Sequence, residues 1–121
     1  MQVPMDKPKI ATAIPQCRYK LGAFVVTVLG EIESLDAVAY RYIAAVITEG
    51  DSEPGLFITA ERASGAHGRD GSYSMRIIMR DGAQIIGTSD RWGQLDLFVH
   101  DVLEVAARIL DLQDEEPYLL S

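Results

Sequence analysis

The segment from Phe24 to Leu29 constrains the fold of this chain more than any other. It is apolar at every position except Thr27. Successive side chains of a β-strand point to opposite faces of its sheet, so a strand of this composition needs cover on both faces. Only the last third of the chain has the pattern of a long amphipathic helix, and one helix covers one face. The sequence therefore predicts a sheet whose second face needs a partner.

The clearest strand pattern lies between residues 73 and 80. Apolar or aromatic residues alternate there with a second set in a period of two: Tyr73, Met75, Ile77 and Met79 against Ser74, Arg76, Ile78 and Arg80. Asp81-Gly82 is the signal of a two-residue type I′ turn. It predicts an antiparallel return over residues 83–87, with Ile78 opposite Ile85.

Other strands are indicated less uniformly. Residues 10–14 suit a short edge strand that ends at Pro15, which cannot donate a ladder hydrogen bond. Residues 23–31 and 56–60 are further strands. Residues 35–49 are ambiguous, because apolar positions fall at helical spacing between Ser34 as a possible N-cap and Gly50. Their aromatic and β-branched residues favour a strand over a helix.

The C-terminal part predicts one long helix, which begins at Ser89 or Trp92 and ends at Leu112. Its buried stripe comprises Leu95, Phe98, Val99, Val102, Ala106 and Ile109. Its polar face comprises Asp96, His100, Asp101, Glu104, Arg108 and Asp111. We interpret Trp92 as an anchor of the helix against the sheet rather than as a stacking platform.

These elements predict an α+β fold, an antiparallel sheet of four to six strands with one long C-terminal helix packed on one face. A chain of 121 residues is long enough for one such core. Residues 1–9 contain Pro4 and Pro8 and are expected to form a flexible N-terminal arm. Residues 10–121 are expected to form a single domain.

Charge and composition exclude several classes of function. The net charge is −7, and residues from Asp90 onward contribute −6 of it, with eight acidic residues against two arginines. Such a field repels phosphate backbones and anionic lipid, so we expect neither a nucleic-acid nor a membrane ligand, whereas a basic protein partner is possible. No apolar run approaches the ~18 residues of a membrane span. Without a secretory signal, and with Cys17 as the single cysteine, the expected location is the cytoplasm.

Candidate chemistry is sparse. The glycine-rich loop over residues 61–71 could hold a ligand through four polar side chains: Arg62, His67, Arg69 and Asp70. A solvated connection explains the same composition, and the glycines match no phosphate-binding fingerprint. His100 lies four residues from both Asp96 and Glu104, but helix-surface ion pairing accounts for that spacing, and a metal needs more converging ligands. We therefore expect no catalytic set, no metal and no cofactor.

The hairpin supplies the candidate interface. If Met75, Ile77 and Met79 face the helix, a second set points away from it: Arg76, Ile78, Arg80 and Ile85. An apolar centre rimmed by arginine is typical of a subunit interface. The sequence thus favours a small non-catalytic interaction or regulatory protein that acts as a homodimer.

Two alternatives stay open. The order of strands followed by one helix resembles the single-stranded nucleic-acid-binding coactivator fold, including its Whirly-type members. That resemblance implies a dimer that binds single strands, and it assigns no binding residues here. The other alternative is a small-molecule-binding domain or enzyme with a pocket under the 61–71 loop.

Overall fold

The computed structural model describes residues 7–35, 37–62 and 73–121. Most of the expected N-terminal arm, residues 1–6, lies outside the described residues. Within its last part, the Lys9 carbonyl accepts a hydrogen bond of 2.9 Å from the Leu35 amide. The backbone is therefore already tied to the sheet at residue 9.

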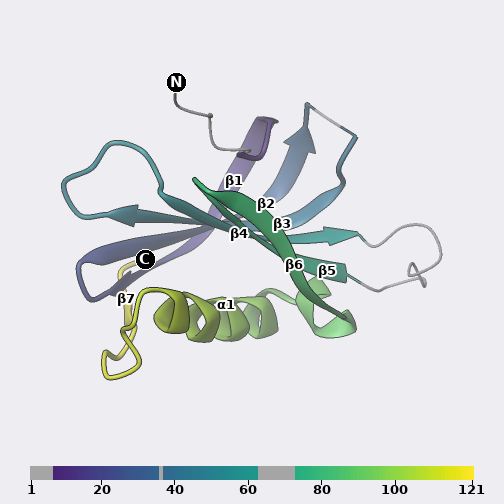
Figure 1. Ribbon diagram of the computed structural model, residues 1–121. Coiled ribbons are helices and arrows are strands. Elements are labelled where there is room, and N and C mark those ends of the chain that lie inside the picture. The colour runs from purple at the N-terminus through teal and green to yellow at the C-terminus, as the bar shows by residue number, and fades with distance from the viewer. Residues whose placement is uncertain (1–6, 36, 63–72) are drawn as a thin grey trace.

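One antiparallel sheet and one helix make up the described fold (Figure 1). The sheet has seven strands in the order β6-β5-β4-β3-β2-β1-β7. The strands are β1 (Ile10–Leu21), β2 (Phe24–Ser34), β3 (Tyr40–Thr48), β4 (Leu56–Arg62), β5 (Tyr73–Met79), β6 (Gly82–Ser89) and β7 (Tyr118–Leu119). A short 3₁₀ helix, η2 (Asp90–Gly93), leads into α1 (Leu95–Ile109), which packs against one face. The predicted α+β architecture is confirmed, with the strand pair of β7 added at the edge of β1.

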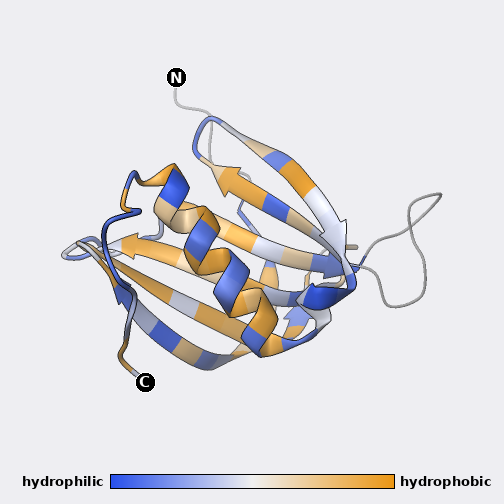
Figure 2. Ribbon diagram, turned by 90° about the horizontal axis from the view of Figure 1, so that it is seen from below, coloured by the Kyte–Doolittle hydropathy of each residue, from blue (hydrophilic) through white to orange (hydrophobic). Residues whose placement is uncertain are grey.

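The core lies between α1 and the sheet. Phe98, Val102 and Ala106 are fully buried on the helix, and the Phe98 ring stacks on Tyr42 of β3 with 5.3 Å between centroids. Figure 2 shows the helix lying across the strands with blue, hydrophilic residues on its outer side. The predicted stripe is therefore the face that packs on the sheet.

The helix is shorter than predicted, because the chain between Ser89 and Leu112 is not one continuous α-helix. The Ser89 hydroxyl accepts a hydrogen bond of 3.1 Å from the Arg91 amide and so caps η2, not α1. At the other end Asp111 has a left-handed φ of 57°, and the Leu112 amide donates to the Ala107 carbonyl at 2.7 Å. A left-handed residue after the last turn closes a helix in this way.

The segment 35–49 contributes the strand β3, as its aromatic and β-branched residues predicted. Val46 pairs with Val26 of β2 on one side and with Leu56 of β4 on the other. Tyr42, Ala44 and Val46 pack in the core under the helix, whereas Ile43 is buried outside that cluster. A strand that needs apolar residues on both faces does not show the simple alternation that separates strands from helices.

The strand β1 does not end at Pro15. It continues to Leu21, with Pro15 opposite Leu29 and register shifts between Thr12 and Ile14 and between Pro15 and Cys17. Bulges of this kind leave residues out of the ladder, and they let a proline stay within a paired strand.

The register of the β5–β6 hairpin differs from the predicted one. Met79 pairs with Gly82, so Arg80 and Asp81 form the turn and Gly82 is the first strand residue, with a φ of 152°. Ile78 consequently lies opposite Ala83, and Ile85 lies opposite Arg76. A register shift follows between Met75 and Arg76. The Asp-Gly signal located the turn correctly, but it did not determine which two residues form it.

Candidate interaction surface

The face of the sheet that is turned away from α1, called the second face here, is mostly apolar. Cross-strand partners share a face, so the register assigns its members row by row. They are Pro15, Arg18 and Lys20 of β1, Val25, Thr27 and Leu29 of β2, Ile43, Ala45 and Ile47 of β3, Phe57, Thr59 and Glu61 of β4, Ser74, Arg76 and Ile78 of β5, and Ala83, Ile85 and Thr88 of β6. In the described part of the chain, Figure 1 shows a helix over the other face and none over this one.

Burial on the second face is uneven. Ile43, Thr59 and Ile78 are buried, whereas their neighbours Val25, Leu29, Ala45, Ile47 and Phe57 are only half-buried. The half-buried apolar side chains adjoin one another across β2, β3 and β4. They form the central part of a surface that a partner could cover.

Both edges of the second face carry strongly exposed apolar side chains. Ile85 on β6 is 55 % exposed and Tyr118 on β7 is 68 % exposed. Tyr118 lies opposite Lys20, which lies opposite Val25, so it belongs to the same face. Single exposed apolar residues are ordinary. Here each lies at an edge of the second face, and Arg76 or Lys20 lies between it and the central apolar residues.

The structure brings three of the four predicted interface residues to this face. Arg76 and Ile85 lie directly opposite each other, one row from Ile78. Ile78 is only 2 % exposed, so it forms part of the floor and offers little area to a partner. Arg80 lies in the exposed hairpin turn, outside the strand rows. The large exposed apolar side chain that the hairpin contributes to this face is therefore Ile85.

A polar cluster lies within the second face. Glu61 is 7 % exposed, and its Oε2 atom accepts a hydrogen bond of 2.7 Å from the Thr59 hydroxyl. The Arg76 Nε atom lies 3.2 Å from the same carboxylate oxygen. Buried carboxylates normally require such partners, so Glu61 and Arg76 stabilise each other across the β4–β5 pair. Removing either one would leave a charge without its partner.

Sequence reasoning missed Glu61 because it placed this residue at the start of the loop. The signal was present, since Phe57, Thr59 and Glu61 alternate with Leu56, Ile58 and Ala60. That period of two continues the strand to Arg62. A charged residue at the end of an alternation is easily assigned to the following loop.

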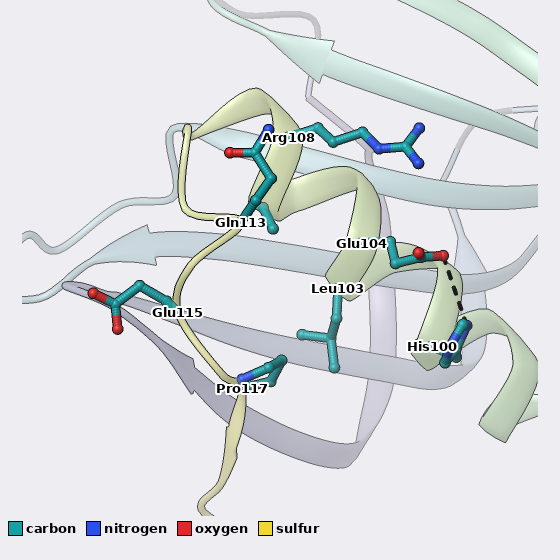
Figure 3. A pocket seen from close by; sticks show the side chains of 8 residues that line it. His100, Leu103, Glu104, Arg108, Gln113, Glu115 and Pro117 are labelled. Carbon is teal, nitrogen blue, oxygen red and sulfur yellow. Dashed lines mark ion pairs between the residues drawn. The ribbon is translucent and has the colours of Figure 1, made fainter.

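A separate cavity of about 460 Å³ lies between α1 and the segment that follows it (Figure 3). It is lined by His100, Leu103, Glu104, Ala107, Arg108, Gln113, Glu115 and Pro117. The His100 Nδ1 atom is 3.9 Å from the Glu104 carboxylate, which is the spacing of a helix-surface pair. Its lining mixes both signs of charge with a few apolar groups and converges on no single ligand chemistry.

The side chains of His100, Asp101 and Glu104 place their ligand atoms within 4.8 Å of one another. Asp101, however, already accepts two hydrogen bonds of 3.0 Å from Arg91 and one of 2.8 Å from the Trp92 indole. The Arg91 hydrogen bonds, aided by those from Trp92 and His100, lower the pKa of Asp101 to about 2, although burial opposes this shift. The positive charge of Arg91 beside this carboxylate disfavours a bound cation. The cluster is best explained as a structural contact that joins α1 to η2.

The predicted ligand loop is described only at its first residue. Arg62 ends β4, is exposed, and its amide donates a hydrogen bond of 2.9 Å to the Ala39 carbonyl. His67, Arg69 and Asp70 lie outside the described residues.

Comparisons of this chain with protein-family models, with curated proteins and with solved structures returned no match. Among the described residues, no helix combines the length and the apolar composition that crossing a bilayer requires.

Proposed function

We propose that this protein is a small non-catalytic interaction protein that acts as a homodimer, in which the second face of one copy covers that of the other. The observation that carries the proposal is the patch of half-buried apolar side chains at the centre of this face, on β2, β3 and β4, with the exposed side chains of Ile85 and Tyr118 at its two edges. A two-fold axis makes the same patch serve both subunits.

Charge supports self-association through this face. Lys20 lies 3.2 Å from Glu49, and Arg76 lies 3.2 Å from Glu61. Among the described residues, the basic side chains of this face are Arg18, Lys20 and Arg76. Lys20 and Arg76 are each paired with an acidic residue of the same chain. The acidic excess begins at Asp90 and includes α1, on the opposite side of the sheet. Two copies can therefore approach face to face with little repulsion between like charges.

A stable dimer would have to use most of the second face. Stable interfaces bury roughly 1,200–2,000 Å² in total, or 20–30 residues on each side. Half-buried residues on β2, β3 and β4, extended by Ile85 and Tyr118, supply an apolar centre. The exposed Lys20–Glu49 pair at its β1 side contributes to the polar rim that such interfaces have, whereas the Glu61–Arg76 pair lies within the face.

Sedimentation equilibrium with two matched variants tests the proposal. At micromolar concentration the wild-type protein should have twice the mass of the 13.3 kDa chain. Ile85→Lys should weaken dimerisation at least tenfold, because it places a charge in the apolar patch. Gln84→Lys adds the same charge to the neighbouring exposed position on the other face of β6, and it should leave the dimer intact.

Ile78 is unsuitable for this test, because a lysine at a buried position would unfold the chain. A wild-type protein that remains at 13.3 kDa at high concentration contradicts the proposal. The proposal would also be contradicted if Ile85→Lys and Gln84→Lys dimerised equally well, because the interface would then not lie on the second face.

A further inference from the structure

The two edges of the sheet differ in how much of their backbone is paired. At one edge the C-terminal strand β7 pairs with β1, and the Leu120 amide donates a further hydrogen bond of 2.8 Å to Arg18. At the other edge β6 pairs with β5 only, among the described residues. An edge strand presents unpaired N–H and C=O groups along one side, which can template another strand.

The composition of β6 does little to prevent such pairing. Its eight residues, Gly-Ala-Gln-Ile-Ile-Gly-Thr-Ser, include no charged residue and no proline. Natural edge strands are usually protected by lysine, proline or very short length. The register shift near Ile85 is the one protective feature in this strand, and both Ile85 and Ile86 are exposed.

A groove accompanies β6 on the helix side of the sheet. A cavity of about 430 Å³ is lined by Ile77 and Met79 of β5, by Ile109 of α1 and by the first residues of β6. Its lining from the hairpin comprises Asp81, Gly82, Ala83 and Gln84. An added strand on β6 would point every second side chain toward the helix side, where this groove offers Ile77, Met79 and Ile109 as apolar contacts.

We propose that β6 binds an extended segment of a partner protein, which adds an eighth strand to the sheet and places an apolar side chain in the groove beside Ile109. Backbone hydrogen bonds supply affinity in this mode of recognition, and the pocket for alternate side chains supplies specificity. The proposal goes beyond the homodimer and does not depend on it, because the dimer is assigned to the second face and this site uses the open edge.

Charge determines which kind of segment fits. Residues from Asp90 onward carry a net charge of −6, and Asp81 lines the groove itself. A second copy paired through β6 would bring two such acidic regions together, which repulsion disfavours. A segment that carries lysine or arginine beside its apolar residues is attracted instead. The partner is therefore an extended, cationic, alternately apolar segment.

The test uses a synthetic octapeptide as the probe, acetyl-Lys-Thr-Val-Thr-Val-Thr-Val-Lys-amide, titrated into ¹⁵N-labelled protein. We expect chemical-shift changes at the amides of Gly82–Ser89 and at Ile77 and Ile109. Two N-methylated peptides act as matched controls, one methylated on the valines and the other on the threonines. In a paired strand, alternate N–H groups face the neighbouring strand. One methylation pattern should therefore weaken binding at least tenfold, and the other by less than about threefold.

Several results would overturn this proposal. Equal losses for both methylated peptides would show docking without strand pairing, and shift changes away from β6 would place the site elsewhere. A version with glutamate at both ends should bind at least tenfold more weakly, and equal binding would contradict the cationic partner. If the peptide dissociated the dimer, the β6 edge would be the site where a second copy of the chain binds, which contradicts a separate partner. A monomeric wild-type protein that still binds the peptide would refute the homodimer alone.

Discussion

At the scale of single residues, Asp101 shows how one carboxylate joins two elements. It lies on α1, yet its side chain accepts hydrogen bonds from Arg91 and Trp92 of η2. It was expected on the solvated face of the helix, and its neighbours His100 and Glu104 are indeed exposed. The indole N–H of a half-buried tryptophan needs an acceptor, and that requirement draws Asp101 inward.

This arrangement predicts a pH-dependent stability. The folded pKa of Asp101 is lowered from 3.8 to about 2, so its contribution is present above pH ~4 and is lost as the pH falls toward 2. Asp101→Asn should lower the free energy of unfolding at pH 7 by about 1–2 kcal/mol, which is less than the ~1.5–3 kcal/mol of a hydrogen bond to a buried charge because Arg91 is partly solvated. Urea titrations should show this difference shrinking between pH 4 and pH 2.

The exposed helix residue Asp96 provides the control. Asp96→Asn should change stability by less than about 0.5 kcal/mol at pH 7, as most exposed substitutions do. A difference between wild type and Asp101→Asn that stayed constant from pH 7 to pH 2 would show that the charge of Asp101 does not stabilise the fold.

At the scale of elements, the sequence predicted β2 to β6, the first part of β1 and the buried stripe of α1, but not β7 or the irregular joints between elements. Residue types were sufficient to predict that β3 is a strand, because its aromatic and β-branched side chains outweighed the helical spacing. They were insufficient to predict the register at Pro15 and at Ile85, because a bulge depends on both strands of a pair. For the candidate site, the alternation indicated an apolar second face, whereas the burial of Ile78 and the pairing of β7 with β1 depend on tertiary contacts that spacing does not encode.

The position of the helix stripe makes a quantitative prediction. Phe98 is fully buried and stacks on Tyr42, so Phe98→Ala should cost about 3–5 kcal/mol through lost burial and a residual cavity. Leu97 is half-buried and lies outside the core cluster. Leu97→Ala should cost clearly less, about 1 kcal/mol. Similar losses in chemical denaturation of the two variants would mean that α1 presents a different side to the sheet.

At the scale of the whole molecule, charge and apolar surface are separated. The acidic excess lies from Asp90 onward, in η2, α1 and the tail, while the second face is apolar and nearly neutral. This separation is compatible with the proposed homodimer, since the charged side would stay in water when the second face is covered. It also bears on the resemblance to single-stranded nucleic-acid-binding proteins, because such binding needs a cationic groove with stacking aromatic groups.

The second face offers little of that chemistry, so we predict weak nucleic-acid binding. Its candidate cations include Lys20 and Arg76, which are already paired with Glu49 and Glu61, and the net charge of −7 repels phosphate over the whole molecule. Fluorescence anisotropy with a labelled oligothymidylate should give a dissociation constant no tighter than about 10⁻⁴–10⁻⁶ M near physiological salt, the range of non-specific complexes. A nanomolar complex that Ile85→Lys left intact would place nucleic acid on another surface, whereas one that competed with dimerisation would assign the second face to single strands.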